Sequence, residues 1–172
     1  MLHSLAFGTL KPFINNKPDD EINQKQLEMT LDVMANSLVY WTQDLVRRKL
    51  LTSGSKIFAM TSSGGHRVIA YYGAVSAAKA ALESHCRQLA MELGAEGISV
   101  NPVQAGVTDT PALRKIPNAE DIIKNALQRN PSHRLTNPAE IAEIIVTVSR
   151  LNTNWMNGNI IYADCGESVV EL

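Results

Sequence analysis

The sequence predicts an α/β fold with a doubly wound parallel sheet. Two kinds of segment indicate it: short, nearly continuous apolar stretches, and longer stretches whose apolar residues recur every three or four positions. A third observation is that the two kinds alternate along the chain. Strands that are apolar on both sides need cover on both faces of their sheet, and right-handed crossovers through helices provide that cover.

Four short apolar segments are predicted to be strands. LHSLAF ends at Gly8, KIFAM leads into the turn-forming TSSGG, ISVNPV follows a glycine-bounded helix, and NIIYAD is entered through Asn157 and Gly158. The prolines and the asparagine and aspartate residues between 11 and 20 predict a loop. The predicted strands cover residues 2–7, 56–60, 98–103 and 159–164.

Four longer segments are predicted to be helices. In the first, large apolar residues recur every three or four positions, and Gly94 ends the second. The fourth has Asn137 as an N-cap, with Pro138 at the first helical position and Glu140 at the third. The predicted helices cover residues 24–51, 72–94, 118–129 and 137–151.

Composition excludes several classes of function. Net charge is −1, hydrophobic residues make up 45% and charged residues 19%, so neither nucleic acid nor a membrane is predicted as a partner. The N-terminus has no basic leader and no cleavage site typical of a signal peptide. Cys86 and Cys165 have no CxxC neighbour and suggest reduced thiols, hence a cytoplasmic protein. The four histidines are scattered, so no metal site is predicted.

The stretch YYGAVSAAKAALES carries the main candidate site. Tyr72 and Lys79 are seven residues apart, which puts them on one helical face about 10 Å apart. The small residues between them leave room for a flat ligand that both side chains could reach. A buried lysine needs polar partners, because an unpaired buried charge is costly. The alternative is that Lys79 extends to solvent and Tyr72 lies at a rim.

Three predicted loops follow the carboxyl ends of strands, where ligands collect in open α/β sheets. They cover residues 4–8, 61–65 and 104–110 and are rich in Ser, Thr and Gly. This composition suits close approach of backbone to a ligand, although many α/β loops share it.

Taken in order, LHSLAFG, KIFAMTSSGG, NPVQAGVTDTPA, RLTNPAEIAEIIVTVSR and MNGNIIYADCG resemble the short-chain dehydrogenase/reductase superfamily. Within it they resemble the bacterial enoyl-acyl carrier protein reductases. Most members of the superfamily place a tyrosine four residues before the lysine, where this chain has Val75. Enoyl reductases place it seven before, where Tyr72 stands. NAEDIIKNALQRNPSHRL resembles the NADPH-preferring bacterial form.

The resemblance implies hydride transfer from NADPH or NADH to a trans-2-enoyl thioester carried on acyl carrier protein, in fatty-acid synthesis. It implies Tyr72, Lys79 and Ser62 as catalytic residues. Residues 109–130 would form a lid over the acyl chain, apolar at Ile122, Ile123 and Leu127. The cofactor-binding residues that it implies are Ser4, Leu5, Ala6, Lys79, Gly106, Thr108 and Thr110.

The resemblance begins at the family's fourth strand, and no glycine-rich phosphate turn precedes residue 30. We therefore expect residues 1–172 to form one partial Rossmann-like domain, N-terminally truncated and lacking the first three strands. Met34 stands where many members carry a water-holding asparagine. The family assembles as a tetramer, so a homo-oligomer is expected. Candidate interface residues, with the protein core as the alternative, are Tyr40, Trp41, Leu89 and Met91.

Two alternatives of function remain open from the sequence. The chain could be a half-fold without turnover, which would keep only the surfaces for assembly. It could also be a ketoreductase-type dehydrogenase, in which Tyr71 or Tyr72 would have to reach a carbonyl directly beside Lys79.

Overall fold

A four-stranded parallel sheet forms the centre of the molecule. The structure is a computed structural model and describes residues 1–171. The strands are hydrogen-bonded in the order β1-β2-β3-β4, each parallel to its neighbour. This confirms the predicted α/β fold with a parallel sheet. The strands are β1 (Leu2–His3), β2 (Lys56–Thr61), β3 (Ser99–Ala105) and β4 (Ile161–Ala163).

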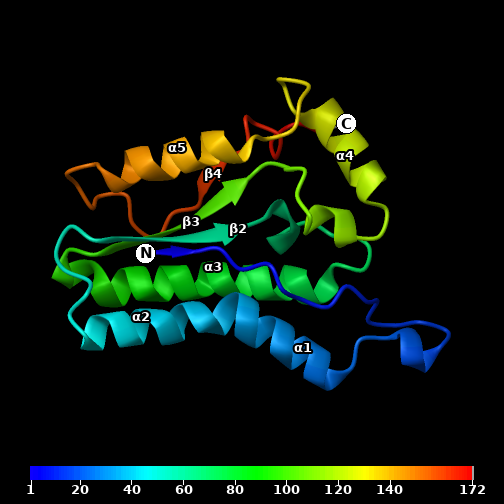
Figure 1. Cartoon of the computed structure of the whole chain (residues 1–172), viewed down its shortest axis with the longest axis horizontal. Coiled ribbons are helices and arrows are strands. Elements are labelled where there is room, and N and C mark those ends of the chain that lie inside the picture. Colours follow the sequence, from blue (N-terminus) through cyan, green and yellow to red (C-terminus); the bar gives the residue numbers. More distant parts are fainter. Residues whose placement is uncertain (172) are drawn as a thin grey trace.

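Helices cover both faces of this sheet. In Figure 1, α3 lies along one face with α1 and α2 beneath it, and α5 lies across the other face. Because every crossover is helical, the carboxyl ends of the strands gather at one edge of the sheet. The helices are α1 (Gln24–Leu31), α2 (Ser37–Arg47), α3 (Gly73–Leu93), α4 (Ala119–Arg129) and α5 (Pro138–Ser149).

The alternation of side chains along β2 divides the core between the two faces. Ile57 and Ala59 point toward α3, where they pack in a cluster with Leu82 and Cys86. Phe58 points the other way and packs with residues of α5, including Ile141. A strand that is buried on both faces favours apolar residues at consecutive positions, which explains the run IFAM in β2.

Two predicted boundaries are wrong. The strand predicted at 2–7 is only Leu2–His3, since the chain leaves the sheet after His3 and residues 4–7 are exposed. The helix predicted at 24–51 ends at Arg47 and contains a π-helical turn, Asp32–Asn36, that separates α1 from α2. One extra residue in a turn still continues the helix, so the apolar period alone did not reveal it.

The other helices and strands lie close to their predicted ranges. The N-cap prediction at Asn137 is confirmed, since its side chain accepts a hydrogen bond from Ala139 N at 3.0 Å and Glu140 completes a capping box. Leu89 is buried in the core cluster of α3, so the core alternative holds there, whereas Trp41 and Met91 are exposed. Within residues 1–171, no helix is both long enough and apolar enough to span a membrane.

Candidate active site

Helix α3 brings Tyr72 and Lys79 to one cavity. Tyr72 is the N-cap residue of α3, and Lys79 follows two turns into the helix. Both side chains line a cavity of about 340 Å³ at the carboxyl ends of the strands. Of the residues between them, Val75 lines the cavity, whereas the small residues, which include Gly73, Ala74 and Ala77, do not.

Lys79 is held by backbone carbonyls rather than by solvent. Its Nζ donates to the carbonyl oxygen of Met60 at 2.6 Å and to that of Leu5 at 3.4 Å. The residue is only 6% exposed, so the alternative in which Lys79 extends to solvent is wrong. An ammonium group has three N–H donors, so one donor is left to face the cavity that Lys79 lines.

A buried carboxylate, that of Glu83, lies one turn after Lys79 on α3. Glu83 is buried, and its Oε1 accepts a hydrogen bond of 2.5 Å from the Thr61 hydroxyl at the end of β2. Burial lowers the pKa of Lys79 to about 8, and the charge of Glu83 acts in the opposite direction. The charge of Lys79 can therefore change at a pH near 8.

Tyr72 packs in a tight niche formed by the turn after β2. Its ring lies against Gly64, where an added Cβ would be 2.5 Å from Cε1 of Tyr72. Burial raises the pKa of the Tyr72 phenol, and the nearby Ser62 side chain acts in the opposite direction. Ser62 also accepts a hydrogen bond of 3.1 Å from Gly64 N, which fixes the turn. Tyr72 thus stays protonated near neutral pH and can act as a hydrogen-bond donor.

The loop after β3 forms the opposite wall. Thr108 donates its hydroxyl hydrogen to the carbonyl of Gly106 at 3.0 Å. Thr110 Oγ1 accepts a hydrogen bond of 3.1 Å from Leu113 N, at the start of a short 3₁₀ turn. Gly106 has no space for a side chain, because an added Cβ would be 2.5 Å from Thr136 Oγ1 and 2.9 Å from Glu167 Oε2.

The structure brings most of the candidate residues together. Leu5 contributes its carbonyl to Lys79 instead of lining the cavity, and Ser4 is not part of the lining. Of the predicted lid residues, Ile122 lines the cavity, whereas Ile123 and Leu127 do not. The candidates that do line it are Ala6, Ser62, Tyr72, Lys79, Gly106, Thr108 and Thr110.

Sequence reasoning missed the apolar half of the cavity. Gly8, Leu10 and Val75 line it, and Met34 reaches it from the π-helical turn. Met34 is 2% exposed and packs with Val75. A π-helical turn often occurs at a functional site, but its only signal in the sequence is a small shift of the helical period.

The chemistry available in the cavity is proton donation and electrostatic stabilisation. A neutral phenol, a buried ammonium group and several hydroxyl groups converge on a partly apolar space. No cluster of three His, Cys, Asp or Glu residues that could hold a metal ion occurs in the part of the chain described by the structure. The arrangement suits an elongated ligand with a polar end near Lys79 and a reacting carbonyl near Tyr72.

Comparison with known proteins gives one consistent family. The model of a family described as enoyl-(acyl carrier protein) reductase matches residues 1–168. The chain is 28% identical over 172 residues to the enoyl-(acyl carrier protein) reductase (NADH) FabI of Synechocystis sp., covering 100% of this chain and 65% of that protein. It is 30% identical over 123 residues to the Bacillus cereus protein of the same name, covering 72% of this chain and 48% of that protein.

Solved structures agree with these relatives. The Bacillus cereus enoyl-acyl carrier protein reductase, solved with NADP⁺ and indole naphthyridinone, superposes with a TM-score of 0.85 at 27% identity. FabI from Candidatus Liberibacter asiaticus superposes with a TM-score of 0.82 at 29% identity. Each match covers 99% of this chain and 65% of the other chain. The chain therefore spans about 65% of the length of the full-length relatives it matches.

Proposed function

This chain belongs to the enoyl-(acyl carrier protein) reductase family, whose model matches residues 1–168, and on that premise we propose that it reduces enoyl thioesters. The substrate class is a trans-2-enoyl thioester carried on acyl carrier protein, and the process is fatty-acid synthesis in the cytoplasm. Residues 1–172 act as one partial Rossmann-like domain. The names of the matched relatives support this proposal.

The cofactor that we propose is NADPH or NADH. The relatives carry NADH in their names, and one solved neighbour was obtained with NADP⁺. The donor set in the cavity fits the nicotinamide and its ribose: the ammonium of Lys79 suits ribose hydroxyls, and Thr108 and Thr110 offer hydroxyl groups nearby. When bound, such a cofactor supplies the hydride.

The roles of the chain's own residues follow from the negative charge that develops on the substrate during the reaction. As a hydride adds to the β-carbon of an enoyl thioester, negative charge develops on the thioester oxygen. Tyr72 donates a hydrogen bond to that oxygen, which stabilises the transition state more than the ground state by a few kcal/mol. Lys79 adds its positive charge and orients the ribose. Ser62 lines the same cavity and would help to orient the Tyr72 hydroxyl, and Ala6 and Gly106 would line the cofactor through their backbone.

The observation that carries this proposal is the shared cavity of Tyr72 and Lys79. The two residues are seven positions apart, and both face the same partly apolar space. The position four residues before Lys79 is Val75, which is 5% exposed, packs with Met34 and cannot donate a proton. This geometry favours enoyl reduction over direct protonation of a ketone beside the lysine.

The test is a spectrophotometric assay with crotonyl thioester and either NADPH or NADH. We expect turnover that falls at least about 100-fold in Tyr72→Phe, because the removed hydroxyl acts on the transition state. Tyr71→Phe is the matched control, since Tyr71 is 41% exposed and does not line the cavity. Absence of turnover and of cofactor binding would favour the half-fold alternative, and reduction of a β-ketoacyl thioester instead would favour the ketoreductase.

We also propose that copies of the chain associate through α2 and α3. Tyr40, Trp41 and Met91 expose 53%, 59% and 67% of their surface on these two helices, and exposed aromatic and methionine side chains are typical of interfaces. Light scattering after size-exclusion chromatography should give an oligomer for the chain and a smaller species for Trp41→Glu. A monomer in both cases would contradict this part of the proposal.

A further inference from the structure

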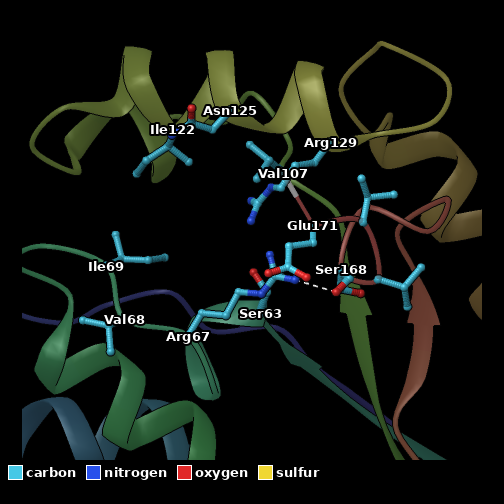
Figure 2. Close-up of a pocket in the computed structure, with 12 residues that line it drawn as sticks. Ser63, Arg67, Val68, Ile69, Val107, Ile122, Asn125, Arg129, Ser168 and Glu171 are labelled. Carbon is cyan, nitrogen blue, oxygen red and sulfur yellow. Dashed lines mark hydrogen bonds between the residues drawn. The ribbon is translucent and has the colours of Figure 1, made fainter.

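A second and larger cavity lies beside the site of Tyr72 and Lys79. Its volume is about 710 Å³, and Figure 2 shows it between α4, the segment 67–69 and the C-terminal segment 168–171. The two cavities share four lining residues: Ser63, Ile69, Val107 and Ile122. A ligand that reacts beside Tyr72 can therefore extend into the second cavity without leaving the protein surface.

Two arginines from opposite walls point into this second cavity. Arg129 extends from α4 and Arg67 from the facing segment (Figure 2). Arg67 donates one hydrogen bond from Nη2 to the carbonyl of Ser168 at 2.5 Å. A guanidinium group carries five N–H donors, so one backbone carbonyl leaves most of the Arg67 donors available.

Arg129 has an unsatisfied donor. Its side chain is 24% exposed, and its Nε atom is buried without a hydrogen-bond partner. The nearest carboxylate atom is Oε1 of Glu167, at 4.0 Å from Nη2, which is an ion-pair distance but not a hydrogen bond. The other oxygen of Glu167 accepts from Val107 N at 3.1 Å. Buried polar groups are normally hydrogen-bonded, so Arg129 is not fully satisfied within the protein, and the part of its side chain that is exposed can meet a ligand.

Two acidic side chains must be included in the charge balance, Glu171 and Glu167. Glu171 also lines the cavity, and in Figure 2 it projects from the C-terminal segment into the space between the arginines. It opposes the entry of an anion, because like charges repel. Glu167 lies behind the lining at 4.0 Å from Arg129, so the two arginines face two carboxylates in all, and an anion would be held by the guanidinium donors and not by an excess of positive charge.

We propose that this cavity binds the phosphate group of the arm that carries the acyl thioester. The inference rests on the proposed function, since it requires the thioester beside Tyr72 and its carrier arm in the second cavity. Guanidinium groups suit a phosphate, which accepts paired N–H bonds from arginine, and both Arg67 and Arg129 line this cavity. The phosphate belongs either to the phosphopantetheine arm of an acyl carrier protein or to the same arm in coenzyme A.

The experiment compares two crotonyl thioesters that differ in one phosphate. Crotonyl-4′-phosphopantetheine and crotonyl-pantetheine serve as substrates for the chain and for Arg67→Gln, Arg129→Gln and Glu171→Gln. We expect each arginine variant to raise KM about tenfold for the phosphorylated thioester, the size of one charged hydrogen bond. We expect kcat, and KM for the phosphate-free thioester, to change less than about twofold.

Glu171→Gln should change KM in the direction opposite to the arginine variants. Removing this carboxylate should lower KM for the phosphorylated thioester and leave the phosphate-free one unchanged. Arg150→Gln is the matched control for net charge, because Arg150 is exposed at the C-terminal end of α5, outside the cavity. An equal effect of Arg150→Gln, or equal effects on both thioesters, would overturn the proposal.

Two further measurements distinguish failure of this inference from failure of the proposed function. Binding of unreactive 4′-phosphopantetheine and pantetheine is measured by calorimetry, which needs no turnover. Tighter binding of the phosphorylated arm that is lost in Arg129→Gln supports the inference even if no thioester is reduced. Turnover that depends on Tyr72 but is indifferent to the phosphate overturns the inference and leaves the proposed function in place.

The source of the phosphate is distinguished with crotonyl-acyl carrier protein and crotonyl-coenzyme A. A sensitivity to Arg129→Gln with both carriers supports recognition of their common phosphate. A sensitivity with coenzyme A alone would overturn the proposal, because it would assign the arginines to the nucleotide end of that molecule.

Discussion

The ring of Tyr72 packs directly on Gly64, so closely that no side chain fits between them. An added Cβ at Gly64 would be 2.5 Å from Cε1 and 2.9 Å from Cδ1 of Tyr72. Gly64 is part of the turn that Ser62 closes after β2, and Tyr72 caps α3. The contact therefore joins the end of a central strand to the start of the helix that carries Lys79, and it sets where the phenol points.

Replacement of Gly64 by alanine should displace the Tyr72 ring. Because the ring is rigid and its niche is closed by the turn, the phenol has to move, and we expect turnover to fall at least about tenfold. The chain should still fold, with a loss of about 1–3 kcal/mol as for other overpacked sites. Steady-state kinetics together with urea denaturation measure both effects.

The matched control for this change is Gly94→Ala. Gly94 has helical dihedral angles, and an added Cβ would meet only Asn157 Nδ2 at 3.5 Å, an ordinary contact. Its turnover should equal that of the unmodified chain. If Gly64→Ala kept full turnover as well, the position of the phenol would not depend on this contact.

The buried ammonium of Lys79 predicts a pH-dependent stability. Its pKa is about 8 in the folded chain, against an ordinary 10.5, mainly because of burial. Between these values the unfolded chain binds more protons than the folded chain, so stability rises as pH increases from about 8 to about 10.5. A shift of this size corresponds to roughly 3 kcal/mol. Below pH 8 the full penalty of burying the charge is present.

Comparison with Lys79→Met isolates this effect. The stability advantage of the methionine variant should be largest at pH 7 and shrink by roughly 3 kcal/mol toward pH 10.5, as measured by urea denaturation. Cys86, whose pKa burial raises to about 12, affects stability above its ordinary pKa in both proteins and cancels in the difference. A difference that does not change with pH would show that Lys79 keeps an ordinary pKa.

Local sequence signals predicted α3 and α5 well, and each for a physical reason. Gly94 follows Leu93, and Gly97 adopts a left-handed conformation after one short turn. At α5, the Asn137 side chain accepts from a first-turn N–H and Pro138 has none to satisfy, so the end of α3 and the start of α5 could both be predicted. The end of β1 could not be predicted from the sequence. LHSLAF is apolar enough for a longer strand, but only Leu2 and His3 pair with β2, and the chain then turns aside to reach Lys79.

The candidate site was predictable where it depends on one helix. The spacing of Tyr72 and Lys79 fixes their common face, and that part could be stated in advance. Arg67 and Arg129 are 62 residues apart in sequence (129 − 67) and meet only through the tertiary fold. No periodicity links such residues. Glu83 had a weak signal, since it lies one turn after Lys79, but its contact with Thr61 needs the sheet.

The N-cap of α5 should contribute a measurable part of stability. Asn137 Oδ1 accepts a hydrogen bond from Ala139 N at 3.0 Å, and Asn137 N donates one to Oε2 of Glu140 at 3.2 Å. Asn137→Ala removes the first of these, and we expect a loss of about 1 kcal/mol by urea denaturation. Asn137→Ser keeps an acceptor and should lose much less. Equal losses in the two variants would mean that the cap hydrogen bond is not what the alanine removes.

Glu83 should control the pH at which Lys79 loses its charge. The carboxylate accepts a 2.5 Å hydrogen bond from Thr61 and is itself buried, and its charge raises the pKa of Lys79 against the larger effect of burial. In Glu83→Gln the amide keeps an acceptor for Thr61 but removes the charge, so the pKa of Lys79 falls further. The alkaline limb of the pH profile of turnover should then move to lower pH, because the charged lysine stabilises the negative charge that develops on the substrate.

Glu92→Gln is the control, since Glu92 is exposed on the same helix and accepts a hydrogen bond from Gln88. A limb that moves in Glu83→Gln and not in Glu92→Gln depends on the charge that Glu83 places beside Lys79. A limb that stays in place would mean that the charge of Lys79 does not limit turnover.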